Sequence, residues 1–131
     1  IFKDVFNVSK HNHGAVYGTD MWEVLAQSKI VINCHIDSTA RFAGNIRLFE
    51  ATGVGTCLLT DHKDNIEDFF VPDKEIVTYK TKEEAVDKIK YLLEHEAYRA
   101  SVARAGQERV YKDHRLEDRI RECGSYILSN L

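Results

Sequence analysis

A short helix closed by glycine, followed at once by an apolar strand, is the feature that most constrains the fold of this chain. The segment reads Gly44-Asn45-Ile46-Arg47-Leu48-Phe49-Glu50-Ala51-Thr52-Gly53-Val54-Gly55-Thr56-Cys57-Leu58-Leu59-Thr60. Asn45 is of the residue type that caps helix N-termini, and Gly53 or Gly55 is a typical C-terminal stop. We therefore expect a helix over 45–53 and a buried strand over 56–60.

Two charged residues interrupt this otherwise apolar helix. Arg47 and Glu50 are three positions apart and so share one helical face, close to a helix N-terminus, where free N–H groups and the helix dipole attract anions. An anion-attracting helix end with a carboxylate one turn away suits a nucleotide diphosphate and its ribose hydroxyls. The alternative is an Arg–Glu surface pair on a core helix.

The rest of the chain alternates between helical and strand patterns. Residues 29–34 are a β-branched run that predicts a strand buried on both faces, and residues 75–79 predict another strand. Thr19 is the expected N-cap of a helix that reaches about Gln27. Further along the chain we expect a helical turn over 65–70, a helix from the capping box at Thr81 to about 95, and helices over about 96–112 and 116–128.

This order of elements predicts an α/β fold with a parallel sheet. In such sheets, ligands bind beyond the carboxyl ends of the strands. The loop 35–44, the turn 60–64 and the start of the Asn45 helix should all lie at that edge. His35 and Asp61, which directly follow two predicted strands, therefore join the candidate site.

Composition sets broad limits on the class of protein. The chain has 131 residues with 44% apolar and 30% charged side chains, which fits a single domain over 1–131. A net charge of −3 gives no broad attraction to nucleic acid or anionic membranes. No apolar run approaches the roughly 20 residues of a membrane-spanning helix. The chain starts at Ile1 and its only methionine is Met21, so we expect a segment of a longer protein.

The three cysteines, Cys34, Cys57 and Cys123, are odd in number and widely spaced. Cys34 and Cys57 fall in strand-like runs, where we expect buried free thiols. This pattern favours a reducing, cytoplasmic setting.

The string His11-Asn12-His13 lacks the surroundings of a nuclease metal site, and Asp61 alone does not make the acidic cluster of a receiver domain. No metal or cofactor is expected.

Several motifs together resemble a known family. They are Gly44-Asn45-x-Arg47-x-Phe49-Glu50-Ala51 with the following glycines, Leu58-Leu59-Thr60, and the tail Ala103-x-x-Gly106-Gln107-Glu108-Arg109-Val110. In order and spacing they resemble the C-terminal domain of GT-B glycosyltransferases, nearest to the CgeB-like, group 1 type. The resemblance covers roughly residues 15–125.

The resemblance implies a Rossmann-like domain followed by C-terminal helices, which binds a nucleotide-diphosphate sugar as donor substrate. An N-terminal domain of the same parent chain would bind the acceptor. Glu50 matches the second glutamate of a Glu-x7-Glu motif, which contacts the donor ribose. Gly44 and Asn45 would bring backbone N–H groups to the diphosphate, and Arg47 would steady it. His35 and Asp61 would border the sugar or the base.

One departure from the family pattern bears on activity. The first glutamate of the motif would fall at position 42, which is Phe42 here. The sequence therefore leaves the catalytic residues unassigned and keeps a second hypothesis open, a non-catalytic nucleotide-sugar-binding or assembly module of the same fold. In the family the last helices brace the two domains, so without its partner domain this segment is expected to expose apolar surface and self-associate.

Overall fold

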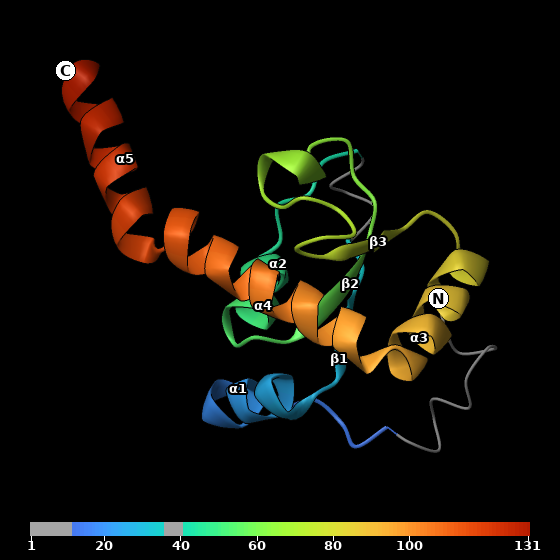
Figure 1. The fold of residues 1–131 in the computed structure, drawn as a ribbon. Coiled ribbons are helices and arrows are strands. Elements are labelled where there is room, and N and C mark those ends of the chain that lie inside the picture. Colours follow the sequence, from blue (N-terminus) through green and yellow to red (C-terminus); the bar gives the residue numbers. More distant parts are fainter. Residues whose placement is uncertain (1–11, 36–40) are drawn as a thin grey trace.

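A three-stranded parallel sheet forms the centre of the protein in a computed structural model that describes residues 12–35 and 41–131 (Figure 1). The strands β1 (Ile30–Asn33), β2 (Cys57–Asp61) and β3 (Val77–Tyr79) lie in the order β1-β2-β3. Asn33 pairs in register with Thr60, and Asp61 pairs with Tyr79. The polar residues that end the three strands therefore meet at one edge of the sheet. A weak strand pattern over 5–8 lies outside the described residues.

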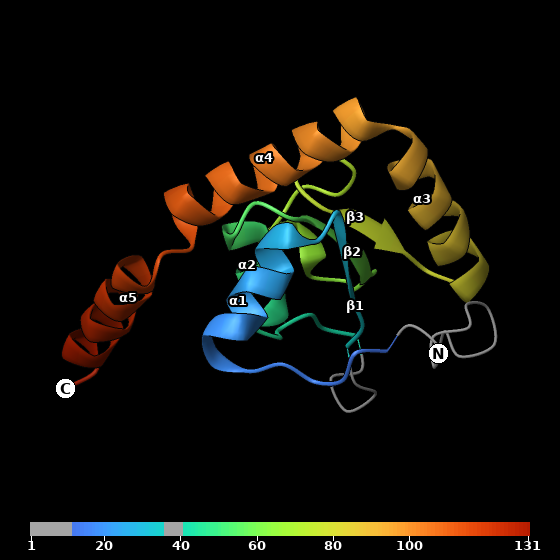
Figure 2. The same ribbon diagram turned by 90° about the horizontal axis from the view of Figure 1, so that it is seen from below.

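Helices surround this sheet and continue beyond it. Their bounds are α1 (Gly18–Gln27), α2 (Arg47–Gly53), the 3₁₀ turn η3 (Ile66–Asp68), α3 (Lys82–Glu94), α4 (Glu96–Asp113) and α5 (Leu116–Ser129). The predicted α/β, Rossmann-like fold class with C-terminal helices is thus confirmed. Figures 1 and 2 show that α4 crosses the sheet and that α5 projects away from it.

Alternate residues of the central strand face two different cores. Leu58 packs with residues of α2, η3 and the end of α4, such as Leu48, Ile66 and Val110. Leu59 packs in a second cluster that is built from β3, α3 and the first half of α4. Because β2 is covered on both faces, every one of its first four residues is buried, as the apolar run predicts.

The tail motif on α4 holds the sheet-facing elements in place. Gly106 lies against the backbone at Glu75, where a Cβ would collide with the carbonyl oxygen. Gln107 donates a hydrogen bond to the Gly53 carbonyl at the end of α2 (3.0 Å), and Arg109 donates one to the Phe69 carbonyl (3.1 Å). Through these two hydrogen bonds, α4 holds the ends of α2 and η3 in place.

Helix ends follow the predicted signals in two places. The Gly55 N–H bonds the Thr52 carbonyl and the Thr56 N–H bonds the Ala51 carbonyl, which is a Schellman motif with Gly55 at φ +82°. At the start of α3 the Thr81 side chain accepts a hydrogen bond from the Glu84 N–H at 3.1 Å. Both predictions, the glycine stop and the Thr81 cap, are confirmed.

Two predicted caps are wrong. Helix α1 begins at Gly18 with Tyr17 as its N-cap and no side-chain cap bond, so Thr19 lies inside the first turn. Helix α2 begins at Arg47 after Ile46, again with no side-chain cap. The Asn45 side chain does not cap α2 because it bonds another side chain across the sheet edge, as described below.

Burial corrects two further expectations. In β1 the Ile32 side chain is 43% exposed, so this strand is not buried on both faces, and β1 pairs with β2 on one side only in the described sheet. Cys34 is exposed, whereas Cys57 is buried as a free thiol. Helix α5 contains no buried residue, so its apolar stripe lies open, in line with the expected exposed surface; self-association itself stays a prediction.

Candidate functional site

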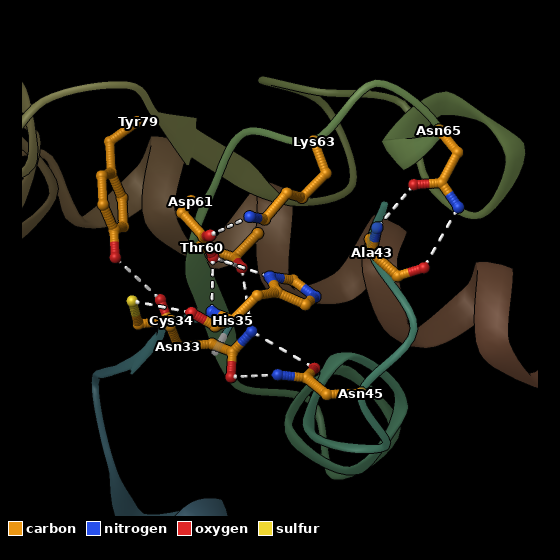
Figure 3. A network of polar contacts seen from close by, with 10 residues as sticks. All are labelled: Asn33, Cys34, His35, Ala43, Asn45, Thr60, Asp61, Lys63, Asn65 and Tyr79. Atoms are coloured by element: carbon orange, nitrogen blue, oxygen red, sulfur yellow. Dashed lines mark hydrogen bonds and ion pairs between the residues drawn. The ribbon is translucent and has the colours of Figure 1, made fainter. Parts of the chain in front are cut away.

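Side chains from β1, β2 and the segment before α2 form one hydrogen-bonded chain at the carboxyl edge of the sheet (Figure 3). The Asn45 amide donates to Asn33 Oδ1 at 2.9 Å. Asn33 Nδ2 in turn donates to Thr60 Oγ1 at 2.9 Å, and the Thr60 hydroxyl lies 3.3 Å from Asp61 Oδ1. Asn33 and Thr60 are both buried, so this chain of bonds satisfies polar groups that would otherwise lose water without replacement.

His35 completes the chain by bonding Asp61 twice. Its backbone N–H donates to Asp61 Oδ1 at 3.0 Å, and its ring Nδ1 lies 2.7 Å from the same oxygen. An ionised carboxylate only accepts hydrogen bonds, so Nδ1 must carry the proton. The His35 side chain has no exposed surface, and its Nε2 is buried with no hydrogen-bond partner in the described chain.

Asp61 is held as an anion by these neighbours. Burial raises its pKa, but the ring and backbone hydrogen bonds from His35, together with Lys63, outweigh burial and leave the pKa of Asp61 below its usual range. Lys63 Nζ lies 3.3 Å from the second carboxylate oxygen. The negative charge of Asp61 is therefore matched by an ammonium group on one side, while the imidazole lies on the other.

The segment between β1 and α2 is fixed to the turn after β2. The Asn65 side chain accepts from the Ala43 N–H at 2.6 Å and donates to the Ala43 carbonyl at 3.1 Å. Arg41 pairs with Asp64 nearby, with its Nε 2.6 Å from Oδ2. Gly44, the next residue, is exposed, and a Cβ placed on it would meet none of the described residues within 4 Å. An anchored backbone with open space at Gly44 leaves room for a ligand.

Arg47 and Glu50 form the predicted pair on α2. Arg47 Nη1 lies 3.1 Å from Glu50 Oε2, and the Arg47 side chain is 34% exposed. The Glu50 side chain is only 14% exposed, and its buried Oε2 has no aligned hydrogen-bond donor among the described residues. The pair thus matches the ion-pair interpretation, and its buried carboxylate oxygen still has capacity to accept a hydrogen bond.

The six candidate residues fall into two groups. His35, Asp61 and Asn45 belong to one bonded chain, and Gly44 lies beside Asn45. Arg47 and Glu50 bond each other on α2, and no hydrogen bond joins them to that chain among the described residues. Asn45 reaches the site through its side chain, which corrects its predicted role as a cap.

Sequence reasoning missed Asn33, Thr60, Lys63, Asn65 and Tyr79. Tyr79 ends β3 and donates its hydroxyl to the Asn33 carbonyl at 2.9 Å. Burial, with Cys34 and Asp61 nearby, raises the pKa of Tyr79 well above its usual range, so the phenol stays neutral. One signal could have found two of the five: the predicted strands 56–60 and 75–79 end in Thr60 and Tyr79, at the edge where ligands bind.

Within residues 12–35 and 41–131, no three His, Cys, Asp or Glu side chains converge where they could hold a metal ion. No helix in these ranges combines the length and apolar character that crossing a bilayer requires.

Comparison with known proteins gives one match. Residues 3–124 match the model of a family described as glycosyl transferase-like. No curated protein and no solved structure matches this sequence. The match covers nearly all of the chain, including every strand of the sheet and all the candidate site residues, and the parallel α/β fold agrees with it. The chain therefore belongs to the glycosyl transferase-like family.

Proposed function

We propose that this chain is the donor-binding part of a GT-B glycosyltransferase of the CgeB-like type. Its ligand would be a nucleotide-diphosphate sugar at the carboxyl edge of the sheet. The observation that carries the proposal is the exposed backbone at Gly44, which directly precedes Asn45 of the bonded chain that includes His35 and Asp61, and lies three residues before Arg47 of the Arg47–Glu50 pair. Membership of the family supplies the reaction class, transfer of a glycosyl group.

Each candidate residue has a role that its geometry supports. The carboxylate of Glu50, whose buried Oε2 has no aligned hydrogen-bond donor among the described residues, would accept hydrogen bonds from the ribose hydroxyls, while Arg47 holds the carboxylate and offers its exposed edge to a phosphate. The exposed backbone at Gly44 would approach the diphosphate. Stabilising the departing diphosphate is electrostatic catalysis, because negative charge develops there in the transition state.

The remaining parts of the proposal concern what surrounds this chain. An acceptor-binding N-terminal domain of the parent protein would face the same sheet edge, and the reaction would take place in the cytoplasm.

A non-catalytic binding module is the second candidate function. It is favoured by Phe42, which is 61% exposed at the position of the missing glutamate. Sugar transfer or donor hydrolysis by the parent protein would exclude this second candidate.

Nucleotide titration tests the proposed donor site. Uridine, guanosine, adenosine and cytidine diphosphates are added separately while amide NMR shifts and melting temperature are followed. We expect one base to be preferred, with shifts centred on residues 44–50. A ligand at about 100 times its Kd should add roughly 2.7 kcal/mol to the free energy of unfolding.

Glu50→Ala tests the assigned ribose contact. We expect the variant to bind the preferred nucleotide more weakly than the wild type. Glu122→Ala is the matched control, because Glu122 pairs with Arg119 at the same three-residue spacing, 2.7 Å apart, on the exposed helix α5. Equal nucleotide affinity for Glu50→Ala and Glu122→Ala would contradict the role of Glu50, and no response to any nucleotide would contradict the donor site.

A further inference from the structure

The ring of His35 contains a nitrogen that the described protein leaves without a partner. The side chain has no exposed surface, so water does not reach Nε2, and yet Nε2 makes no hydrogen bond to the described residues. Leaving a buried polar atom unpaired destabilises the folded state, because the atom loses its water without a replacement. Native proteins seldom tolerate this without a functional reason or a bound group. Nε2 thus has an unused hydrogen-bonding capacity inside the candidate site.

The bonded nitrogen of the same ring determines what Nε2 can do. Because Nδ1 donates to the Asp61 carboxylate, Nε2 is an acceptor when the ring is neutral and a donor when the ring is protonated. Asp61 already has Lys63 at its other oxygen. Lys63 therefore supplies a positive charge beside Asp61 that does not depend on the ring.

Among the described residues, the other groups of this network do not compete for this role. Directly after β1, Cys34 directs its sulfur to the His35 carbonyl at 3.5 Å. From β3, Tyr79 is a neutral phenol that bonds the Asn33 carbonyl. From the segment before α2, Asn45 is an uncharged amide that bonds Asn33, and Arg41 is paired with Asp64. The charged groups nearest the ring in this network are Asp61 and, beyond it, Lys63.

The orientation of the ring indicates where a ligand would meet it. In Figure 3 the imidazole extends from Asp61 toward the segment that carries Ala43 and Asn45. Gly44, with its open backbone, lies between those two residues. A group that reaches Nε2 from this side would pass the part of the site that we assign to the diphosphate.

We propose that His35 binds a phosphoryl oxygen of the nucleoside diphosphate through Nε2 as an imidazolium, so that binding takes up one proton from solution. This inference rests on the proposed donor site and states how one residue of that site contacts the diphosphate. With a carboxylate at Nδ1 and a phosphate at Nε2, the ring lies between two anions, and both favour its charged form. A charge-assisted bond in a buried position is also stronger than a neutral one.

The alternative ligand, a sugar or ribose hydroxyl, predicts the opposite pH dependence. A hydroxyl would donate to the neutral Nε2, so acid would weaken binding. A phosphate would accept from the protonated Nε2, so acid would strengthen binding. The sign of the pH effect that depends on His35 therefore separates the two.

The first test measures nucleoside diphosphate affinity between about pH 5 and pH 8, where histidine changes its charge. For the wild type we expect Kd to rise with pH by up to about tenfold per unit. The ligand phosphate itself titrates near pH 6, so the readout is the difference in slope between the wild type and His35→Gln. His95→Gln is the control, since His95 stacks on Tyr91 between α3 and α4, and it should keep the wild-type slope.

The second test needs no variant and remains valid if His35→Gln does not fold. Ring ¹⁵N shifts of His35 are recorded with the nucleoside diphosphate and, separately, with inorganic pyrophosphate. A change of His35 to the imidazolium pattern with the nucleoside diphosphate supports the inference. If pyrophosphate alone produces it, His35 binds phosphoryl oxygens as an imidazolium, but the nucleotide-donor function fails and the nucleoside diphosphate is overturned as the ligand. If the nucleotide binds with unchanged His35 shifts or equal slopes, the inference is overturned and the donor site stands. If neither probe changes His35, the inference is overturned.

Discussion

The side-chain amides of Asn45 and Asn33 are paired, with Asn45 Nδ2 2.9 Å from Asn33 Oδ1. Asn33 ends β1, and Asn45 precedes α2 by two residues, so this pair ties the start of the helix to the sheet edge. Asn33 is only 6% exposed. Its amide therefore depends on Asn45 and Thr60 for partners.

Asn45→Ala should destabilise the protein by about 1–3 kcal/mol, because it leaves the Asn33 carbonyl oxygen buried with an unmade hydrogen bond. Urea unfolding of the two proteins measures the difference. Asn130→Ala is the control, since Asn130 bonds only at the exposed end of α5. Equal stability of all three proteins would contradict a structural role for the amide pair.

Acid should weaken the fold through Asp61. The hydrogen bonds from His35 keep the folded pKa of this carboxyl below its usual range, while in the unfolded chain it is close to about 3.9. The stabilisation is thus fully present above about pH 4 and is lost as pH falls through the folded pKa. The free energy of unfolding should therefore fall as the pH is lowered from about 4 through the folded pKa of Asp61.

Asp61→Asn keeps an oxygen that can accept from His35 but removes the ionisable group. The stability gap between the wild type and this variant should therefore narrow as pH falls below about 4. A gap that stays constant with pH would show that Asp61 titrates alike in the folded and unfolded protein.

Gly106→Ala should destabilise the protein by about 1–3 kcal/mol, because the added methyl group meets the Glu75 carbonyl at a close helix–backbone contact. Gly124→Ala makes the same change on α5, where a Cβ meets nothing within 4 Å. That substitution should be neutral or stabilise the helix by up to about 1 kcal/mol. Thermal unfolding distinguishes them, and a harmless Gly106→Ala would refute the close packing of α4.

Thr81→Ala should cost about 1 kcal/mol of stability, since the Thr81 hydroxyl caps α3 through the Glu84 N–H. Thr19→Ala should leave stability nearly unchanged, because Thr19 lies within the first turn of α1, whose N-cap makes no side-chain bond. Chemical denaturation of both variants provides the comparison. A larger loss for Thr19→Ala would reverse the structural assignment of the two caps.

The difference between these two threonines illustrates what local sequence can predict. The capping box at Thr81 is a short-range pattern, because the cap and its partner are three residues apart and one helical turn brings them together. Asn45 carries an equally good local signal, but it bonds Asn33, which is twelve residues away. A side chain that has a partner in the folded sheet is no longer available for a cap.

The candidate site shows the same limit. The sequence places His35 and Asp61 after two strands, and from parallel topology this was enough to expect them at one edge. It does not show that they share a 2.7 Å contact, nor that Lys63 and Asn65 fix the loop beside them. Those contacts depend on strand register and on turns that no short-range pattern describes.

The sequence by itself determined the order of helices and strands, the parallel α/β class and a glycine stop after α2, because periodicity and backbone conformation are local properties. Tertiary structure alone decided which polar side chains bond one another, that Ile32 and Cys34 are exposed, and that His35 Nε2 is buried without a partner among the described residues. Pairing and burial depend on residues that are distant in the chain, and only the folded sheet brings them together.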